Sequence, residues 1–508
     1  MSRPTLSAES VRLLPSNVTT PTYDRTGLTT GIVHVGVGGF HRAHMARTID
    51  RLLSQGLAKE WAICGVGLLD SDRRMKDVLA EQDHLYTLTV RHSDGSQDTA
   101  VIGSIVDYLW APEDPEAVIE RMAQPTTKIV SLTVTEGGYN IDRVTGAFDV
   151  TEPAVAAEIA GGAPRTAFGF VTEALRRRRD RGVPAFTVLS CDNVQNNGDI
   201  AASAFTSFAD AQDPDLAKWI SANVAFPNSM VDRITPVTTR DDIDDVAARL
   251  GVHDEWPVIC EPFFQWVIED RFAAGRPPFE HAGAQLVDDV EPYELMKLRL
   301  LNASHQALCY FGYLMGYRLV HEATADPLIS SLLTRYMDDE ATPTLRPVPG
   351  VELGAYKRTL IERFSNPAVR DTVARLCADS SDRIPKWLVP VVRERLAAGG
   401  SVTWGAAVIA SWARYAEGID EQGEPITVVD PLRDELVAIA RAQADDRLAF
   451  VRNERLFGDL ARDEVFVAAY LTASDLLRSG GARHTLQHLL DIAGTRIDPH
   501  HDTPKEKL

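Results

Sequence analysis

The sequence predicts two domains, an α/β domain with a mostly parallel sheet over residues 1–290 and a mostly α-helical domain over residues 291–508. Two observations predict this division. From Gly31 to about Val290, short β-branched runs alternate with helical patterns, which is typical of parallel strands joined by helices. After Pro292 the strand-like runs nearly vanish, and long amphipathic stretches follow.

The individual elements follow from hydrophobic periodicity and from the turn residues that bound each run. The expected strands are Ile32–Val37, Trp61–Val66, Leu85–Arg91, Lys128–Thr135, Pro184–Ser190 and Pro257–Cys260. The clearest expected helices are Arg165–Arg181 in the first domain and Glu294–Met315, Leu353–Phe364 and Ala406–Ala416 in the second. The polar tail Pro499–Leu508 is expected to fray.

Length and composition exclude several classes of protein. Of the 508 residues, 44% are hydrophobic and 24% are charged, so a large core can form. Lys and Arg number 52 against 72 Asp and Glu, and the net charge of −20 disfavours nucleic acid and anionic membranes as partners. We expect a cytoplasmic protein, because the sequence has no signal-type apolar core and no apolar run near the roughly 20 residues of a membrane span. Five scattered cysteines fit a reducing compartment.

A glycine-rich turn follows the first expected strand and predicts a dinucleotide site. The cofactor-binding residues expected here are Val35, Gly36, Val37, Gly38, Gly39 and Phe40. Glycines let the backbone turn tightly and approach a pyrophosphate, whose charge a helix N-terminus accepts. His41 stands where the third glycine of G-x-G-x-x-G would be, so the pattern alone also fits a turn without a ligand.

Acidic residues after the second expected strand favour NAD over NADP. Asp70 and Asp72 lie near the position where a ribose 2′-hydroxyl would bind. We favour Asp72 for this contact, whereas Asp70 either caps the following helix or takes the ribose itself. Arg73 and Arg74 argue in the other direction, because an arginine there can accept a 2′-phosphate.

No metal site is expected. His41 and His44 lie three residues apart near the start of the first helix, but no third ligand stands at a suitable spacing. The cysteines form no C-x-x-C pair. Packing or hydrogen bonding explains the two histidines better than metal binding does.

The first helix of the second domain carries three polar outliers, Lys297, Asn302 and His305. At about 100° per residue their side chains span an arc of roughly 140°, so one flank of a regular helix could direct all three into a cleft between the domains. A solvated helix face is the alternative reading. Tyr293 and Lys297 also match the Y-x-x-x-K pair of short-chain dehydrogenases, which we reject because that pair belongs inside a single nucleotide-binding domain.

Five segments together resemble the polyol-specific long-chain dehydrogenases, and most closely their mannitol 2-dehydrogenase members. The resemblance covers nearly the whole chain. The segments are Gly36–His44, Thr133–Tyr139, Ser190–Asn193, Phe226–Pro236 and Lys297–His305. The resemblance implies a zinc-independent, NAD-dependent dehydrogenase that acts as a monomer, with an N-terminal Rossmann-type domain, a helical C-terminal domain and an active site in the cleft between them.

The same resemblance implies roles for individual residues. Lys297 matches the catalytic lysine of the family, and Asn193 and Asn302 match its oxyanion-stabilising pair. The remaining matches are Glu294 as a proton-escorting carboxylate, His305 and Asp232 as polar groups on the substrate side, Arg375 and Arg383 as basic substrate contacts, and Thr135 as a cofactor contact. For Arg375 and Arg383 a solvated surface is an equally good interpretation, and a turn after a strand is the alternative for Asn193.

The expected reaction is oxidation of a free polyol at a secondary carbon, with D-mannitol and D-fructose as the first candidates. Lys297 must be neutral to take the hydroxyl proton, and burial lowers the pKa of a lysine. The two asparagine amides would stabilise the developing alkoxide. D-arabinitol oxidation and fructuronate reduction remain alternatives. The segment Glu136–Tyr139 lacks the lysine that uronate reductases tend to carry. A catalytically silent NAD-binding sensor is a remote alternative.

Overall fold

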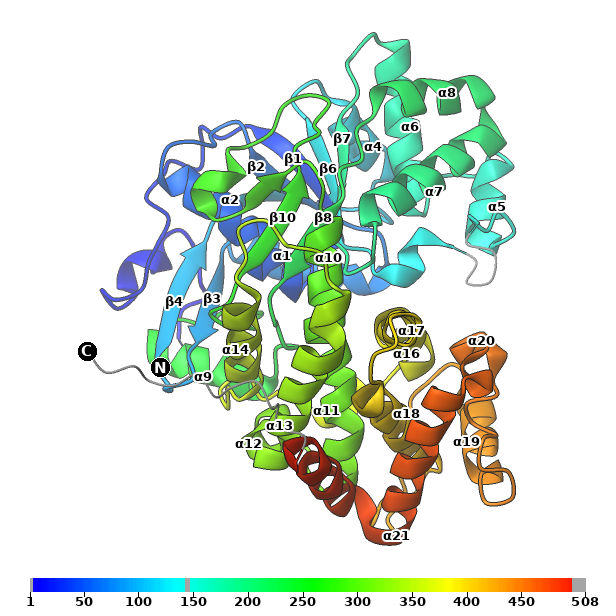
Figure 1. Ribbon diagram of the computed structural model, residues 1–508. Helices are drawn as coiled ribbons and strands as arrows, with labels where there is room; N and C mark the ends of the chain where they lie inside the picture. The colour runs from blue at the N-terminus through cyan, green and yellow to red at the C-terminus, as the bar shows by residue number, and fades with distance from the viewer. Residues whose placement is uncertain (1–2, 142–146, 496–508) are drawn as a thin grey trace, which may run out of the picture. The chain divides into compact units, whose positions relative to one another are not determined.

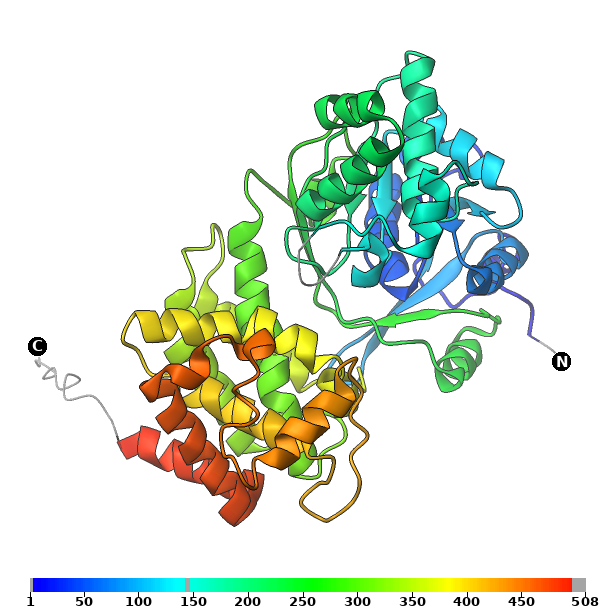
Figure 2. The same ribbon diagram turned by 90° about the vertical axis from the view of Figure 1, so that its right-hand side faces the viewer.

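The computed structural model describes residues 3–141 and 147–495, and the polar tail Pro499–Leu508 lies outside this range. The chain divides into two compact units, Met1–Glu291 (unit 1) and Pro292–Leu508 (unit 2). Unit 1 runs from blue to green in Figures 1 and 2, and unit 2 runs from green to red. Among the helices that the structure describes, none combines the length and the apolarity that crossing a membrane requires.

A five-stranded parallel sheet forms the centre of unit 1, in the order β5-β2-β1-β6-β7. Its strands are β1 (Thr30–Val35), β2 (Ala62–Gly67), β5 (Ile105–Trp110), β6 (Ile129–Leu132) and β7 (Thr187–Ser190). Val33 of the central strand pairs with Cys64 of β2 and with Val130 of β6. The predicted α/β class of this domain is confirmed. The first strand ends two residues earlier than predicted, because Gly36 has a φ of +91° and leaves the extended region.

Both faces of this sheet are buried, as expected for parallel strands covered by helices. Val33, Val35 and Val66 face the helices α4, α6 and α7, whereas Ile32 and Ile63 face α2 and α3. Figure 1 shows α4, α6 and α7 together beside β6 and β7. The helices of unit 1 are α1 (Gly39–Ala43), α2 (Met45–Ser54), α3 (Arg73–Glu81), α4 (Pro115–Ala123), α5 (Pro153–Ile159), α6 (Ala167–Asp180), α7 (Asn197–Gln212), α8 (Pro214–Asn223) and α9 (Arg240–Leu250).

Two smaller sheets correct part of the sequence-based prediction. The predicted strands Leu85–Arg91 and Pro257–Cys260 do not belong to the main sheet. They lie in a separate sheet with the order β4-β3-β9. Its strands are β3 (Tyr86–Arg91), β4 (Gln97–Ile102) and β9 (Val258–Cys260). The Asp94-Gly95 turn, with Gly95 at a φ of +85°, folds β3 and β4 into an antiparallel hairpin that we did not predict. The other small sheet has the order β11-β10-β8. It comprises β8 (Ser229–Asp232), β10 (Gln265–Glu269) and β11 (Gln285–Val287).

Unit 2 is helical, as predicted, and no strand of three or more residues occurs in its described part. Its helices are α10 (Glu291–Met296), α11 (Ala303–Leu314), α12 (Val320–Ala325), α13 (Pro327–Arg335), α14 (Leu353–Phe364), α15 (Val373–Cys377), α16 (Ser380–Trp387), α17 (Val389–Ala397), α18 (Thr403–Ala416), α19 (Arg433–Ala442), α20 (Glu454–Phe457) and α21 (Glu464–Thr495), the last interrupted at Gly481. Most residues of α11 and α18 are buried, so these two helices form the core of the unit. The Trp412 ring of α18 packs against the rings of Phe450 and Phe457.

The predicted helix Glu294–Met315 is not regular. It consists of α10, a π-helix over Lys297–Asn302, and α11. A second π-helix spans Tyr336–Ala341 directly after α13. The 140° arc calculated for Lys297, Asn302 and His305 therefore does not apply, because a π-helix has i→i+5 hydrogen bonds and a smaller rotation per residue.

Candidate functional site

The glycine turn after β1 is fixed by a close approach of two backbones. Gly36 donates its N–H to the Val66 carbonyl at 3.0 Å, and a Cβ at Gly36 would lie 2.2 Å from the Thr133 carbonyl oxygen. Gly36 therefore lies where β1, β2 and β6 end side by side. A Cβ at Gly38 would meet no atom within 4 Å among the described residues. The turn is thus tight at Gly36 and open at Gly38, which is the arrangement that a pyrophosphate requires.

The helix that follows this turn is shorter than the sequence suggests. α1 ends at Ala43, and His44 interrupts the path into α2 with a φ of −114° and a ψ of −90°. A five-residue helix gives little macrodipole, so a bound pyrophosphate would depend mainly on the backbone N–H groups of the turn itself.

A buried histidine, His34, stabilises the turn through hydrogen bonds to the neighbouring strand β6 and the residue that follows it. The Nδ1 of His34 lies 2.8 Å from the Ser131 hydroxyl, and its Nε2 lies 2.9 Å from the Thr133 hydroxyl. Thr133 in turn donates to the Gly36 carbonyl at 2.6 Å. Burial lowers the pKa of His34 to about 3, so the ring is neutral and can accept one hydrogen bond and donate another. The His41 ring stacks on it with a centroid distance of 3.4 Å.

The two acids after β2 have different environments. Asp70 is exposed, whereas Asp72 is half-buried and accepts the Leu69 N–H at 2.9 Å. This contact closes the 3-10 turn Asp70–Asp72, and neither acid caps the following helix α3 through its side chain. The guanidinium of Arg74 lies over the Trp256 ring at 4.5 Å, and that of Arg73 lies over the Trp110 ring at 5.7 Å. Both arginines therefore have aromatic partners.

A buried carboxylate joins the ends of β6 and β7. Asp192 accepts hydrogen bonds from the Thr135 N–H at 2.8 Å, the Val134 N–H at 3.1 Å and the Tyr139 hydroxyl at 2.8 Å. Burial raises the pKa of Asp192. Thr135 has a φ of +65°, which is a strained conformation for a β-branched residue. Asp192 thus holds Thr135, a strained residue that we expect near the cofactor. Asp192 itself immediately precedes Asn193, the expected oxyanion residue.

Asn193 and Asp232 complete the predicted residues of unit 1. Asn193 is exposed at the carboxyl end of β7, and Asp232 is buried at the end of β8. Asn197 links the two segments, because its side-chain amide donates to the Ser229 carbonyl at 2.8 Å and to the Asp192 carbonyl at 3.0 Å. Asn197 thus ties the segment before Asn193 to the first residue of β8, whereas Asp232 is the last residue of that strand.

The predicted residues of unit 2 centre on the Lys297–Asn302 π-helix. Glu294, Lys297 and Asn302 are buried, and His305 is half-buried with its ring 4.5 Å from the Phe364 ring. The Asn302 Nδ2 has no hydrogen-bond partner among the residues that the structure describes. A buried amide donor without a partner costs free energy, which is explained if a ligand oxygen accepts from it.

Tyr293 has a hydrogen-bond acceptor outside the helix that carries Lys297. Its hydroxyl donates to the Pro349 carbonyl at 2.8 Å.

Arg375 and Arg383 lie close to each other in the same unit. Arg375 forms a bidentate ion pair with Asp371 at 2.7 and 2.5 Å, which raises the pKa of the guanidinium. Arg383 donates to the Leu376 carbonyl at 3.1 Å, and the Gln306 side chain of α11 donates to the same carbonyl at 3.2 Å. Both arginines therefore lie in the segment that packs on α11. The α11 residue that contacts this segment is Gln306, which directly follows His305.

Sequence reasoning assigned no role to His34, Asp192 or Arg299. For Asp192 the signal was a carboxylate directly after a buried strand. His34 offered a weaker signal, a polar ring within an otherwise apolar strand. Nothing in the residues around Arg299 indicated a role for it, because its partner Glu394 lies 95 residues away.

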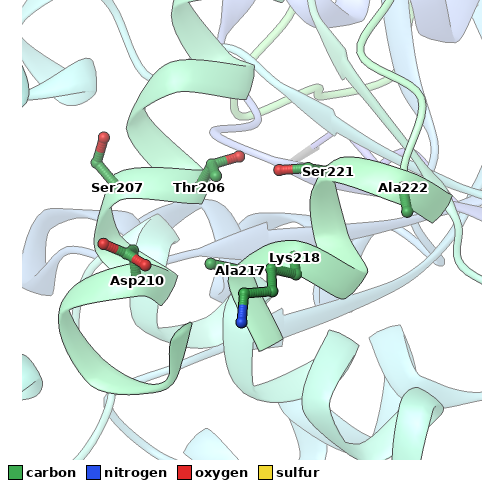
Figure 3. Close-up of a pocket in the computed structure, with 7 residues that line it drawn as sticks. All are labelled: Thr206, Ser207, Asp210, Ala217, Lys218, Ser221 and Ala222. Atoms are coloured by element: carbon green, nitrogen blue, oxygen red, sulfur yellow. The ribbon is translucent and has the colours of Figure 1, made fainter. Parts of the chain in front are cut away.

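A shallow hollow of about 570 Å³ lies between α7 and α8 and contains none of the predicted site residues (Figure 3). It is lined by Thr206, Ser207, Asp210, Ala217, Lys218, Ser221 and Ala222. Within residues 3–141 and 147–495, no group of three or more His, Cys, Asp or Glu side chains could hold a metal ion.

The parallel sheet order, the glycine turn at the point where the strand order reverses between β1 and β6, and the acid after β2 are the features of a Rossmann-type dinucleotide-binding domain. Comparison with known families specifies this class further. The model of the mannitol dehydrogenase Rossmann domain matches residues 30–281, and that of the mannitol dehydrogenase C-terminal domain matches residues 289–477. The chain belongs to the mannitol dehydrogenase family.

Individual relatives are similar over most of the chain. A mannitol 2-dehydrogenase of Phaeosphaeria nodorum is 47% identical over 475 residues, covering 92% of this chain and 83% of the relative. The solved ternary complex of Pseudomonas fluorescens mannitol 2-dehydrogenase with NAD and D-mannitol is 44% identical, with a TM-score of 0.87 over 96% of this chain and 99% of that one. A D-sorbitol dehydrogenase solved in substrate-free form is 39% identical, with a TM-score of 0.88 over 95% of this chain and 100% of that one.

Proposed function

We propose that this protein is an NAD-dependent polyol dehydrogenase that oxidises D-mannitol to D-fructose, reversibly and without a metal. The observation that carries the proposal is the buried Lys297, followed within one π-helix by Asn302, whose buried amide nitrogen has no hydrogen-bond partner among the described residues. The family and the similarity to a complex with NAD and D-mannitol favour this polyol over others.

The residues of unit 1 fit a dinucleotide. The open space at Gly38, the tight turn at Gly36 and the half-buried Asp72 would hold the pyrophosphate and the adenosine ribose. The Thr135 backbone, fixed by Asp192, would contact the nicotinamide half. When bound, NAD supplies the acceptor for the hydride that leaves the secondary carbon of the polyol.

Two kinds of side chain would act on the substrate hydroxyl. Neutral Lys297 accepts its proton as the C–H bond breaks, and the amide groups of Asn302 and Asn193 donate hydrogen bonds to the developing alkoxide. Glu294, one helical turn before Lys297, takes the proton onward to solvent. In the reverse direction protonated Lys297 returns it to the ketose oxygen.

The remaining predicted residues would bind the polyol chain. The Asp232 carboxylate would accept hydrogen bonds from further hydroxyl groups, and the His305 ring would accept or donate one. Arg375 and Arg383 would contribute additional donors. From the family resemblance we further propose that the enzyme acts as a monomer, and from the five scattered cysteines that it acts in the reducing cytoplasm.

The test is a substrate panel followed by NADH absorbance. D-mannitol, D-sorbitol, D-arabinitol and xylitol are compared in the forward direction, and fructose and fructuronate in the reverse direction. We expect the highest kcat/KM for mannitol and fructose. A preference for D-arabinitol or fructuronate would reassign the substrate, and NAD binding without turnover of any compound would indicate a sensor.

D-sorbitol is a second candidate substrate. The D-sorbitol dehydrogenase at 39% identity aligns over nearly the full chain. The ratio of kcat/KM for mannitol to that for sorbitol distinguishes the two, and a ratio below one would favour sorbitol.

A further inference from the structure

The Lys297–Asn302 π-helix changes how its two end residues face each other. In an α-helix, side chains five residues apart point about 140° away from each other. A π-helix closes its hydrogen bonds between residues i and i+5, so the residues at its two ends lie nearly one above the other. Lys297 and Asn302 are such a pair. The π-helix therefore turns the lysine and the unpartnered amide toward the same side.

Arg299 lies inside this π-helix and is tied to two distant segments. Its guanidinium nitrogens lie 2.6 and 2.7 Å from the two carboxylate oxygens of Glu394 on α17. It also donates to the Thr344 carbonyl at 2.7 Å. The Arg299 side chain is 9% exposed. A planar guanidinium in a bidentate pair fixes orientation as well as distance, which a lysine ammonium does not.

We propose that Arg299 is a positioning residue that holds the π-helix in register, so that Lys297 and Asn302 act on the same substrate hydroxyl. This inference rests on the proposed function, because it assigns the two residues to one reacting group. It needs no contact between Arg299 and substrate or cofactor. Its action is transmitted through the backbone between Lys297 and Asn302.

Arg299→Met removes the clamp with little change in side-chain volume. We expect kcat for mannitol oxidation to fall about 10- to 100-fold, the loss that a misplacement of about 1 Å produces. The KM for NAD should stay within about twofold, because the glycine turn belongs to unit 1. The pH midpoint of kcat/KM should shift, because the surroundings of Lys297 change. Arg299→Lys should recover part of the loss.

Arg414→Met is the matched control. Like Arg299, Arg414 binds one carboxylate, that of Glu417 at 3.1 Å, and one backbone carbonyl, that of Ile419 at 2.9 Å, and it lies in the same unit. The control should keep the kcat and the pH profile of the unmodified protein. If Arg299→Met does not fold, Glu394→Gln takes its place, since it keeps the arginine and weakens the pair. We expect a change in the same direction, smaller in size.

The outcomes separate this inference from the proposed function. An unmodified protein that oxidises no polyol would overturn the function itself. Normal oxidation, lost on Lys297→Ala but unchanged in kcat and pH profile in the Arg299 and Glu394 variants, would overturn only the positioning role. An equal loss in Arg414→Met would also overturn it, because the effect would then be general destabilisation.

Discussion

At the scale of single residues, the proposed role of Lys297 requires its side chain to be neutral when it accepts a proton and protonated when it returns one. Lys297→Ala should lose at least about 1,000-fold in kcat/KM for polyol oxidation and still bind NADH, because the glycine turn is in unit 1. Lys297→Arg, which keeps the charge but cannot give up its proton, should be equally inactive. Steady-state kinetics and NADH fluorescence titration measure the two effects.

The pH dependence of the unmodified enzyme provides an internal check. Oxidation should improve as pH rises, since the neutral lysine is the active form, and ketose reduction should improve as pH falls. Retention of more than about a tenth of kcat in Lys297→Ala, with an unchanged profile, would assign the base to another residue.

We predict that the choice between NAD and NADP depends on Asp72. We expect NAD to exceed NADP by at least about tenfold in kcat/KM, or about 1.4 kcal/mol, from repulsion of the 2′-phosphate. Asp72→Ala should narrow the ratio, and Asp70→Ala should leave it unchanged. Since Asp72 also accepts the Leu69 N–H, Asp72→Asn keeps that contact and isolates the effect of charge. The reverse pattern between the two alanine variants would assign the ribose contact to Asp70.

The family resemblance proposed most of the candidate site but not its supports. Lys297, Asn302 and Asn193 were proposed because they stand inside segments that match the family, and their catalytic roles stay predictions. The partners of His34, Asp192 and Arg299 are distant in sequence, and a single sequence carries no pairing information. The roles of Arg375 and Arg383 stay predictions in the same way. Arg375 has an ion-pair partner within its own segment, which fits a structural role as well as a substrate contact.

At the scale of elements, the turn after β1 offers a matched pair of glycines. Gly36→Ala would place a Cβ 2.2 Å from the Thr133 carbonyl oxygen at a φ of +91°, so it should destabilise the fold. Gly38→Ala has open space and a φ of −108°, so the thermal midpoint should stay near that of the unmodified protein. NADH affinity should nevertheless fall, because the space belongs to the proposed cofactor.

Thermal unfolding and NADH titration of both variants test this prediction. Unchanged NADH affinity in a folded Gly38→Ala protein would place the cofactor elsewhere. A Gly36→Ala protein as stable as the unmodified one would contradict the close approach to β6.

Periodicity predicted the type of most elements but not their partners. Leu353–Phe364 matches α14 at both ends, since its apolar face and its boundaries are local features. The strand Leu85–Arg91 was also recognised, yet it belongs to a separate sheet because of the hairpin with β4. The π-helix was not predicted, because one additional residue per turn leaves almost no trace in an apolar pattern.

At the scale of the whole molecule, buried histidines predict a loss of stability in acid. The pKa of His34 is lowered to about 3 and that of His41 well below its ordinary value, mainly by burial. The unfolded chain, with histidine pKa values near 6.5, binds more protons than the folded chain below that pH. The free energy of unfolding therefore loses nothing to these histidines above about pH 6.5, and it falls as the pH drops toward 3. His34 alone should lower the free energy of unfolding by about 2 kcal/mol at pH 5.

Thermal midpoints measured between pH 5 and 8 test this prediction. His41→Phe keeps an aromatic ring against His34 and removes one titrating group, so its midpoint should fall less steeply in acid. His281→Gln changes an exposed histidine and should leave the slope unchanged. Equal slopes in all three proteins would contradict the prediction.

The fold class was the most predictable feature, because β-branched runs alternate with helical patterns before Pro292 and give way to long amphipathic stretches after it. The helical nature of unit 2 followed from that change alone. The order of strands in the main sheet did not, since it depends on which crossovers the helices make rather than on the composition of any one strand.

The five cysteines are free thiols, and both units contain some of them. All are unpaired and at most 3% exposed, with Cys64, Cys191 and Cys260 in unit 1 and Cys309 and Cys377 in unit 2. Burial raises the pKa of the Cys260 thiol to about 11, so the reactive thiolate is scarce as well as covered. Alkylation can then proceed only when a unit opens. The chain consequently carries built-in reporters of local opening, and mass spectrometry of labelled peptides would time the opening of each unit separately.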